Sequence, residues 1–339
     1  MTKRTMRAGD RTIGEQAPVF VIAEIGINHN GDPELAREMI RMAADAGADA
    51  VKFQTYTTES LVAEGNYYYE LFRKAEISEL AALTELQGYA ASQGVLFFSS
   101  ATSATGFDIL ERLDLPLIKL SSANLTNIPL LRRVGASAKP VIISSGAATL
   151  SEVARAEETL REAGAPQVAV LKCTSIYPCP PEHANLAGIE TLRSAFSGPI
   201  GFSDHTAGIT AATAAVALGA TIIEKHFTLD KSMEGHDHHF SADPPELRDM
   251  IVAIRAMERM RGDPQIRPVG DEIEFRAISR RYVTALRDIA EGTTIAADML
   301  VSRRPKDGPG ILPEHLDVIV DRTAHRAVPA GHSVKWDDI

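Results

Sequence analysis

Eight short apolar runs, each followed by a helix-like stretch, constrain the fold of this chain more than any other feature. The runs are "VFVIAEIG", "AVKFQTY", "VLFFSSA", "LIKLSSA", "PVIISSGA", "VAVLKCTS", "PIGFSDHT" and "TIIEKHFTL". Between them lie amphipathic segments such as "DPELAREMIRMAADAGA", which close on small residues before the next run. Continuous apolar runs alternating with helices are typical of buried parallel strands. We therefore expect a (β/α)8 TIM barrel, with an open doubly wound sheet as the alternative.

The rest of the chain predicts a second, smaller domain. We place the barrel at residues 1–263, a polar linker at 264–279 and a small β-rich domain at 280–339. Within the last region, "RDIAEGTTIAAD" and "RAVPAGHSVKWD" form a weak repeat that matches Arg287 with Arg326, Gly292 with Gly331, Ile295 with Val334 and Asp298 with Asp337. Two similar turn-and-strand units indicate a module with its own core, although chance similarity over so short a stretch is the alternative.

Composition excludes several classes of partner. The formal net charge of −10 argues against nucleic acid or an anionic membrane, because both attract a basic surface. No uninterrupted apolar stretch reaches the roughly 18 residues of a membrane span, and no signal peptide is recognisable, which favours a cytoplasmic protein. Cys173 and Cys179 are too few for a disulfide framework and lack zinc-ligand spacing, so we expect reduced thiols.

Polar residues stand where the predicted strands end. Side chains at positions i and i+2 of a strand point the same way, and barrel active sites lie at the carboxyl ends of the strands. Glu224 and His226 should therefore share a face, as should Ser203 and His205 on the neighbouring strand. The same geometry collects Glu24, Lys52, Gln54, Ser99, Lys119, Ser121, Ser144 and either Thr174 or Ser175. One such residue is usually a satisfied hydrogen bonder, but polar groups from every strand indicate a site.

The residue types suggest chemistry for that site. Two imidazoles flanked by Glu224 and Asp204 suit a divalent metal with open positions, although simple histidine–carboxylate hydrogen bonds are the alternative. Lys52 and Lys119 would be costly buried charges without an anion, and a phosphate with a carboxylate fits two lysines among hydroxyls. A Schiff base on Lys119 or Lys225, or a non-catalytic carbohydrate-binding barrel, remains possible. The histidines of "GHDHHF" lie beyond the strand, and we expect at least two to be solvated.

Seven ordered motifs carry a family resemblance: "IAEIGINHNGD", "VKFQTY", "IKLSSANLTNIPLL", "CTSIYPCPPE", "GFSDHT", "EKHFTLD" and "GHDHHFSADP". Together they resemble the sialic acid synthase family, the phosphoenolpyruvate (PEP)-dependent synthases of nonulosonic acids. The tail, with "SRRPKDGPGI" and "RAVPAG", is similar to that family's C-terminal antifreeze-like (SAF) domain. The resemblance covers the whole chain.

The resemblance implies a transferase that uses manganese or magnesium. It implies that PEP condenses with the open-chain aldehyde of an N-acetylated hexosamine, by C–O cleavage, to give a nonulosonic acid and phosphate. N-acetylmannosamine, a 2,4-diacetamido-trideoxyhexose and a phosphorylated hexosamine are the acceptors left open. The resemblance also implies a homodimer in which each tail covers the barrel of the other subunit.

Residue roles follow from the matching motifs. The resemblance implies that His205 and His226 are metal ligands, that Glu224 lies close by, and that Glu24 handles protons or orients water. It assigns PEP binding to Lys52, Ser100, Lys119, Ser122, Ser175 and Ser203, and sugar binding to Gln54, Tyr177, Asp237 and Arg304. The chain departs from the family pattern at Ser100, where a threonine is common, at Ala123, where a glycine is usual, and at Ser175, where an asparagine sometimes stands. It departs also at Asn124, which takes a usually acidic position and puts the sugar or proton-transfer role there in doubt.

Overall fold

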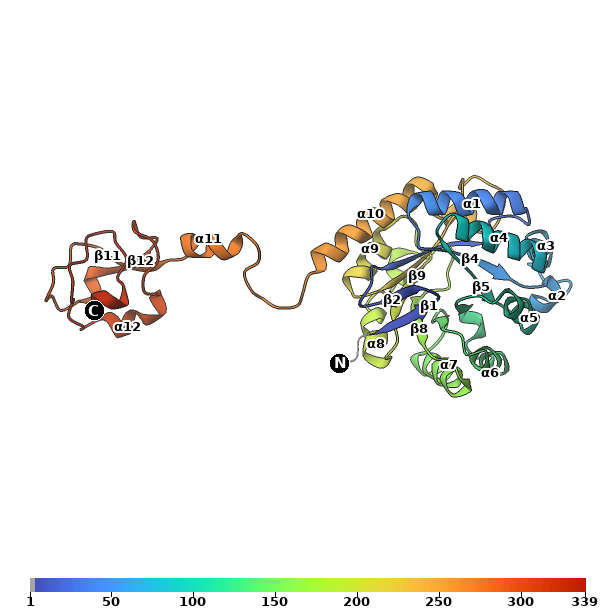
Figure 1. The fold of residues 1–339 in the computed structure, drawn as a ribbon, viewed down its shortest axis with the longest axis horizontal. Coiled ribbons are helices and arrows are strands. Elements are labelled where there is room, and N and C mark those ends of the chain that lie inside the picture. Colours follow the sequence, from blue (N-terminus) through green and yellow to red (C-terminus); the bar gives the residue numbers. More distant parts are fainter. Residues whose placement is uncertain (1–3) are drawn as a thin grey trace. The chain divides into compact units, whose positions relative to one another are not determined.

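The structure, a computed structural model, describes residues 4–339, which form two compact units divided after residue 262. The first unit holds all the long helices and a closed sheet, and the second is a small unit with little regular structure (Figure 1). The boundary falls after Gly262, at the end of the last long helix.

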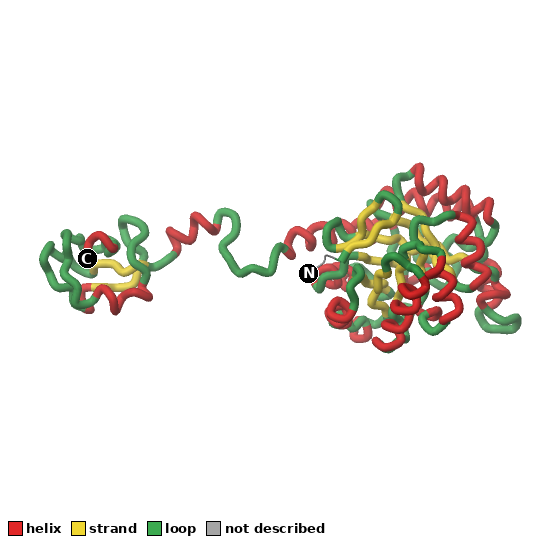
Figure 2. The backbone as a smooth tube through the Cα atoms, turned by 60° about the horizontal axis from the view of Figure 1, so that its bottom comes forward, coloured by secondary structure: helices red, strands yellow, loops and turns green. Residues whose placement is uncertain are grey.

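Eight parallel strands close into a barrel in the order β10-β3-β4-β5-β6-β7-β8-β9. This confirms the predicted barrel and excludes an open sheet. Figure 2 shows the strands enclosed by a ring of helices. The strands are β3 (Phe20–Gly26), β4 (Ala50–Thr55), β5 (Leu96–Ala101), β6 (Ile118–Leu120), β7 (Val141–Ser144), β8 (Val168–Cys173), β9 (Ile200–Asp204) and β10 (Ile222–His226).

The helices of the ring follow the local signals of the sequence. Helix α1 begins after Asp32, whose side chain accepts hydrogen bonds from two first-turn amides, and it ends at Gly47 in a left-handed conformation (φ 95°). The others are α4 (Leu80–Ser92), α5 (Ala104–Leu113), α6 (Ile128–Ala136), α7 (Leu150–Ala163), α8 (Gly188–Ala195), α9 (Thr210–Ala217) and α10 (Pro244–Arg261), with α1 spanning Pro33–Ala46. Two short helices, α2 (Thr58–Leu61) and α3 (Tyr69–Lys74), interrupt the loop after β4. Within residues 4–339, no helix combines the length and apolarity needed to cross a membrane.

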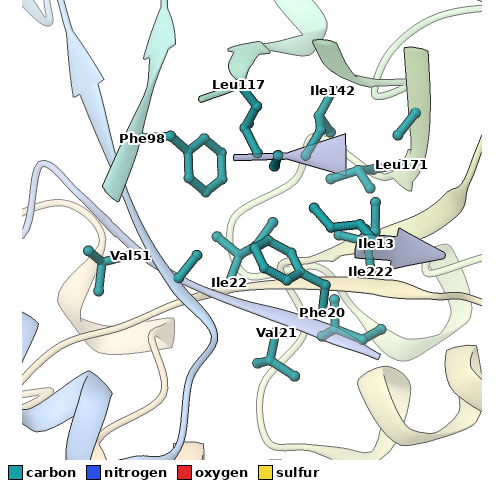
Figure 3. Close-up of a cluster of buried hydrophobic side chains, with 14 of the residues drawn as sticks. Ile13, Phe20, Val21, Ile22, Val51, Phe98, Leu117, Ile142, Leu171 and Ile222 are labelled. Carbon is teal, nitrogen blue, oxygen red and sulfur yellow. The ribbon is translucent and has the colours of Figure 1, made fainter. Parts of the chain in front are cut away.

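An N-terminal hairpin, β1 (Thr5–Ala8) and β2 (Arg11–Gly14), is absent from the sequence prediction. Its Met6 and Ile13 are fully buried in the barrel core, and Figure 3 shows Ile13 among Phe20, Leu171 and Ile222. Gln167, just before β8, exchanges hydrogen bonds with the hairpin backbone, donating to the Thr5 carbonyl at 3.0 Å. The hairpin therefore covers the amino ends of the strands, which leaves the opposite end for a site.

The second unit is built on the sequence repeat. Strands β11 (Tyr282–Ala285) and β12 (Leu300–Arg303) pair antiparallel, and α12 spans Leu316–Ile319. The two repeats pair with each other, because Ile289 and Val328 exchange backbone hydrogen bonds of 3.0 and 2.8 Å. The matched Ile295 and Val334 are both fully buried, and the matched Gly292 and Gly331 both have positive φ, at 80° and 88°. The repeat is thus a structural one.

Candidate active site

A cavity of about 490 Å³ lies at the carboxyl ends of the barrel strands, and every strand contributes a side chain to it. The strand residues that line it are Glu24, Lys52, Gln54, Ser100, Lys119, Ser144, Cys173, Ser203, Glu224 and His226. Loop residues that complete the wall include Ser121, Ser122, Asn124, Tyr177 and His205. The parity argument therefore locates most of the lining from sequence, including both predicted pairs on β9 and β10.

Two carboxylates and one lysine form a buried cluster in the cavity. Lys52 Nζ lies 2.7 Å from Glu24 Oε2 and 3.7 Å from Glu224 Oε2, and it donates to Ser100 Oγ at 3.0 Å. Both carboxylate oxygens lie within ion-pair distance of Lys52 Nζ, but neither accepts a hydrogen bond of good geometry. Gln54 Nε2 donates to the other oxygen of Glu24 at 3.0 Å, whereas Ser203 Oγ donates to Glu224 at 2.8 Å. Both oxygens are enclosed, so Lys52, rather than solvent, balances the charge of the two carboxylates.

The two carboxyl groups have opposite pKa shifts. Burial raises the pKa of Glu24 above its ordinary value, although Lys52 opposes the shift and Glu224 adds to it. Burial would also raise the pKa of Glu224, but Lys119 and Lys52, with the Ser203 hydroxyl, lower it to about 2. Glu224 is therefore an anion near neutral pH. Glu24 is the carboxyl group better suited to take up and return a proton.

Lys119 is a buried cation with no carboxylate partner among the described residues. Its Nζ donates to Ser144 Oγ at 2.6 Å and to the Leu120 carbonyl at 3.1 Å, and its side chain is almost fully buried. Burial lowers its pKa, and the attraction of Glu224 offsets this shift only in part. A buried charge of this kind is stabilised by a bound anion.

The imidazoles of His205 and His226 lie together, with ring centroids 5.3 Å apart. His205 Nδ1 lies 2.7 Å from the Thr174 carbonyl, so it donates there and the neutral ring keeps its lone pair on Nε2. His226 Nδ1 is buried without a hydrogen-bond partner, although Asp237 Oδ2 lies 3.4 Å away. Burial lowers the pKa of His226 to about 3, which keeps this ring neutral.

Both neutral rings can act as nitrogen ligands of a divalent metal. Protonation of His205 opposes metal binding there. Burial would lower the pKa of His205, but the Cys173 thiol and the Thr174 carbonyl raise it, so a metal there competes with a proton. Within residues 4–339, no group of three histidine, cysteine, aspartate or glutamate side chains is arranged to hold an ion. Two protein ligands would leave several positions for water or substrate, as expected for a catalytic rather than a structural ion.

Some of the expected neighbours point elsewhere. Asp204 and Lys225 do not line the cavity: they form a buried ion pair of 2.9 Å behind it, and Asp204 also accepts from the Thr206 backbone and hydroxyl. Each lies one residue from a cavity residue, so its side chain faces the opposite side of the strand. Ser99 likewise pairs with Thr55 at 2.8 Å, and Ser100 takes its place in the cavity. Asp204 therefore does not flank the imidazoles, and Lys225 is not placed for a Schiff base.

The remaining predicted site residues are spread more widely. Tyr177 stacks against His205 with ring centroids 4.1 Å apart. Asp237 is buried beside His226 but does not line the cavity, and Ser175 lines a neighbouring cavity. Arg304 belongs to the second unit, where it is exposed and donates to the Ser279 carbonyl at 3.1 Å. In the "GHDHHF" loop, two histidines, His236 and His239, are exposed, and His238 is buried.

Sequence reasoning missed four lining residues: Leu61, Phe72, Thr102 and Cys173. Cys173 could have been found by parity, since it lies two positions after Leu171 on the inward face of β8. Leu61 and Phe72 come from α2 and α3, two short helices in the loop after β4 for which the sequence pattern predicts no element. They give the polar cavity an apolar side.

Comparison with known proteins places the chain among synthases. The NeuB family matches residues 39–265, and the SAF domain matches residues 280–339. The chain belongs to the NeuB family. It is 36% identical to the N,N'-diacetyllegionaminic acid synthase of Legionella pneumophila over 98% of this chain and 97% of that protein. It is also 36% identical to the human N-acetylneuraminate-9-phosphate synthase, over 88% of this chain and 87% of that protein.

A solved structure agrees with this placement. The N-acetylneuraminic acid (sialic acid) synthetase of Leptospira borgpetersenii is 36% identical, with a TM-score of 0.77 over 81% of this chain and 96% of that one. These three relatives of the NeuB-family protein are all synthases of acids of the sialic and legionaminic type.

Asn124, the residue at the usually acidic position, has a structural task in this protein. Its Nδ2 donates to the Thr102 carbonyl at 3.1 Å and approaches the Ala101 carbonyl at 3.4 Å, while its Oδ1 accepts from Asn127 at 3.2 Å. The amide therefore ties the end of β5 to the loop after β6. A carboxylate could not donate these bonds.

We expect Asn124→Asp to destabilise the protein by about 1–3 kcal/mol, because a buried carboxylate would face carbonyl oxygens with no donor between them. Thermal and denaturant unfolding would measure the change. Asn66→Asp is the matched control, since the exposed Asn66 side chain only accepts, from the Tyr68 amide at 2.9 Å. Equal stability of the two variants would contradict a donor role for Asn124.

Proposed function

We propose that this protein is a PEP-dependent synthase that joins PEP to the open-chain aldehyde of an N-acetylated hexosamine, giving a nonulosonic acid and phosphate. The observation that carries the proposal is Lys119, a buried cation lining the cavity whose hydrogen-bond acceptors are both neutral. Family membership supports the same reaction class. A metal-independent Schiff-base aldolase and a non-catalytic sugar-binding barrel are the competing functions.

Charge balance orients PEP in the cavity. Lys52 lies within ion-pair distance of both Glu24 and Glu224, whereas Lys119 has no described carboxylate that close, so the phosphate dianion fits best at Lys119 with the Ser122 hydroxyl. The carboxylate of PEP then falls toward Lys52, Ser100 and Ser203. This places the reacting carbons beside the imidazoles and the two glutamates.

The chain's own groups would then serve each step of the condensation. C3 of PEP attacks the aldehyde carbon and forms the new C–C bond, water adds at C2, and the C2–O bond to phosphate breaks to leave the 2-keto acid. Glu24 is placed to hold or return a proton during these steps, and Lys119 keeps the departing phosphate compensated. A divalent ion held by His205 and His226 would supply Lewis-acid polarisation of the aldehyde oxygen. The use of manganese or magnesium and the cytoplasmic location remain predictions from the sequence.

The acceptor sugar would occupy the side of the cavity lined by Leu61, Phe72 and Tyr177, with Gln54 at the edge of the polar cluster and Asp237 behind His226. The polar cluster on the other side is matched to PEP. We leave the acceptor as an N-acetylated or diacetamido hexose, with or without a phosphate.

Phosphate release is the direct test of the reaction. The purified protein, given PEP and a panel of N-acetylated hexosamines, should release inorganic phosphate only when PEP, one of these sugars and a divalent metal are all present. Borohydride should trap no carbonyl adduct on Lys119, because an anion-binding lysine forms no Schiff base. A reduced adduct on Lys119 in the mass spectrum would favour the aldolase, and no phosphate release with any acceptor would favour a non-catalytic barrel.

The second unit is proposed to act on a second copy of the chain. Helix α11 (Glu272–Ser279), in the stretch 264–279 that we propose as a linker, has no buried residue, and Ile273, Phe275 and Ile278 are each more than half exposed. Phe275 and Ile278 are three residues apart and share one face of the helix, whereas Ile273 lies on the other side; exposed apolar side chains of this size favour burial against a partner. A homodimer with exchanged tails would cover them and bring Arg304 to the other subunit's cavity.

We expect Arg304→Ala to raise the KM of the sugar or lower kcat by about ten- to a hundredfold, because an arginine donating to an amide carbonyl in a partly dry cleft contributes about 1.5–3 kcal/mol. Steady-state kinetics would show PEP affinity nearly unchanged. Arg326→Ala, at an exposed arginine of the second repeat, is the control.

The proposed exchange of tails between subunits can be tested by mixing two inactive variants. Mixing Arg304→Ala subunits with His226→Ala subunits should partly restore activity, since one barrel of each heterodimer then has both residues. Heterodimers that form and stay as inactive as their parents would contradict the exchange.

A further inference from the structure

A second cavity, of about 730 Å³, lies behind the wall of the first. Both are lined by Cys173 at the end of β8. The second is bounded by residues of α7 and α8, such as Val153 and Leu192, so it lies between β8 and the helices outside the barrel. Of the predicted site residues, only Ser175 and its alternative Thr174 line it.

Lys172 is the charged group of this cavity. It lies between Leu171 and Cys173 on β8, so its side chain faces away from the barrel interior, and it is 9% exposed. Its Nζ donates to the Cys173 carbonyl at 3.1 Å and to Thr174 Oγ1 at 2.9 Å, both neutral acceptors. No carboxylate of the described residues lies within 4.0 Å of it, and none lines the cavity.

The packing around Lys172 makes room for this charge. A Cβ added at Gly188, the first residue of α8, would lie 3.1 Å from Lys172 Cε, so a larger residue there would crowd the lysine stem. The other polar lining groups are hydroxyls and an amide, from Ser145, Thr149, Ser175, Asn185 and Thr191, although the Thr149 hydroxyl already donates to Glu152 at 2.8 Å. In a chain with 45 acidic and 35 basic residues, a large cavity with a buried lysine and no carboxylate is a selective environment for an anion.

We propose that the Lys172 cavity is a second phosphate-binding site, next to the proposed PEP site. The ammonium group supplies charge, and the hydroxyls supply neutral donors suited to a tetrahedral oxyanion. The identity of the phosphate's source rests on the proposed function, because that reaction releases inorganic phosphate from PEP.

The wall between the two cavities is thin at Gly146. A Cβ added there would come within 2.8 Å of Ser122 Oγ, which lines the first cavity, and 2.1 Å of Ser175 Oγ, which lines the second. Ser122 Oγ also accepts from the Gly146 amide at 2.9 Å. Phosphate that leaves C2 beside Lys119 and Ser122 is therefore separated from the Lys172 cavity by one glycine and two serine hydroxyls. The released product is the nearest source of an occupant.

Calorimetric titration with inorganic phosphate tests the site without turnover. In Lys119→Met, which removes the charge of the first cavity, phosphate should still bind, and adding Lys172→Met should weaken that binding about ten- to a hundredfold. Lys119→Met with Lys139→Met is the matched control, because Lys139 lines neither of these cavities. Loss of phosphate binding in Lys119→Met alone, or equal affinity in the two double variants, would overturn the proposal.

The unsubstituted protein offers a check that does not depend on a variant folding. Crystals soaked in selenate should show anomalous density within hydrogen-bonding distance of Lys172 Nζ, and its absence at saturating selenate would contradict the site. Failure of PEP-dependent phosphate release would refute the reaction proposed above, but it would leave both of these binding results standing.

A sugar phosphate is the other source of the same ligand chemistry. If N-acetylmannosamine 6-phosphate binds Lys119→Met and loses that affinity with Lys172→Met, while N-acetylmannosamine is unaffected, the phosphate arrives on the acceptor. If only inorganic phosphate shows the dependence on Lys172, the occupant is the product of PEP cleavage. Either result supports a phosphate site, whereas no dependence on Lys172 for either compound rejects it.

Discussion

Replacing His226 with alanine is expected to lower turnover by about a hundred- to ten-thousandfold, because loss of a metal ligand removes several kcal/mol of charge stabilisation. The barrel should stay folded, since His226 Nδ1 makes no hydrogen bond that the substitution would break. Metal bound per subunit after dialysis against manganese, together with phosphate release, would measure both effects. Circular dichroism would check the fold.

His239→Ala is the matched control for this prediction, because His239 is an exposed histidine in the loop that follows β10. It should leave metal content and turnover unchanged. Full activity of a metal-depleted His226→Ala protein would contradict a metal role for the imidazole pair. Loss of activity with unchanged metal content would instead limit His226 to contacts with substrate.

The barrel was predictable because eight apolar runs alternate with eight amphipathic segments, and few folds accept that order. Most of the cavity followed from the two-residue period of a strand, which places Glu224 with His226 and Ser203 with His205. Asp204 and Lys225 each lie one residue from a cavity residue, so the same rule predicts that their side chains face the outside of the barrel sheet, where they pair with each other.

Other features depend on packing that a sequence pattern does not encode. The N-terminal hairpin is too short for a clear period, and its burial comes from the barrel end that it covers. The choice between Ser99 and Ser100 depends on the phase of β5, set by its register against β4. The donor role of Asn124 depends on two carbonyls that approach it from the end of β5.

Lys119→Met should weaken PEP binding by about a hundredfold or more, because the substitution removes a cavity cation that has no described carboxylate within ion-pair distance. The same change should raise the stability of the ligand-free protein, by about 1–4 kcal/mol if it follows other buried charges replaced by apolar groups. Methionine keeps the length of the side chain and leaves only the Ser144 hydroxyl and the Leu120 carbonyl without their donor. Calorimetry with PEP and chemical unfolding without ligand would measure the two effects separately.

Lys225→Met is the matched comparison for Lys119→Met, and we expect it to change stability in the opposite direction. Lys225 is as deeply buried as Lys119, but it is paired with Asp204 at 2.9 Å and donates to the Thr206 carbonyl. Its removal leaves a buried aspartate without its cation, which should cost about 3–5 kcal/mol of stability. An opposite sign in the two unfolding measurements is therefore expected if Lys119 is held for a ligand and Lys225 for the fold. If both variants lose stability alike and bind PEP normally, Lys119 is a structural lysine and the proposed PEP site is wrong.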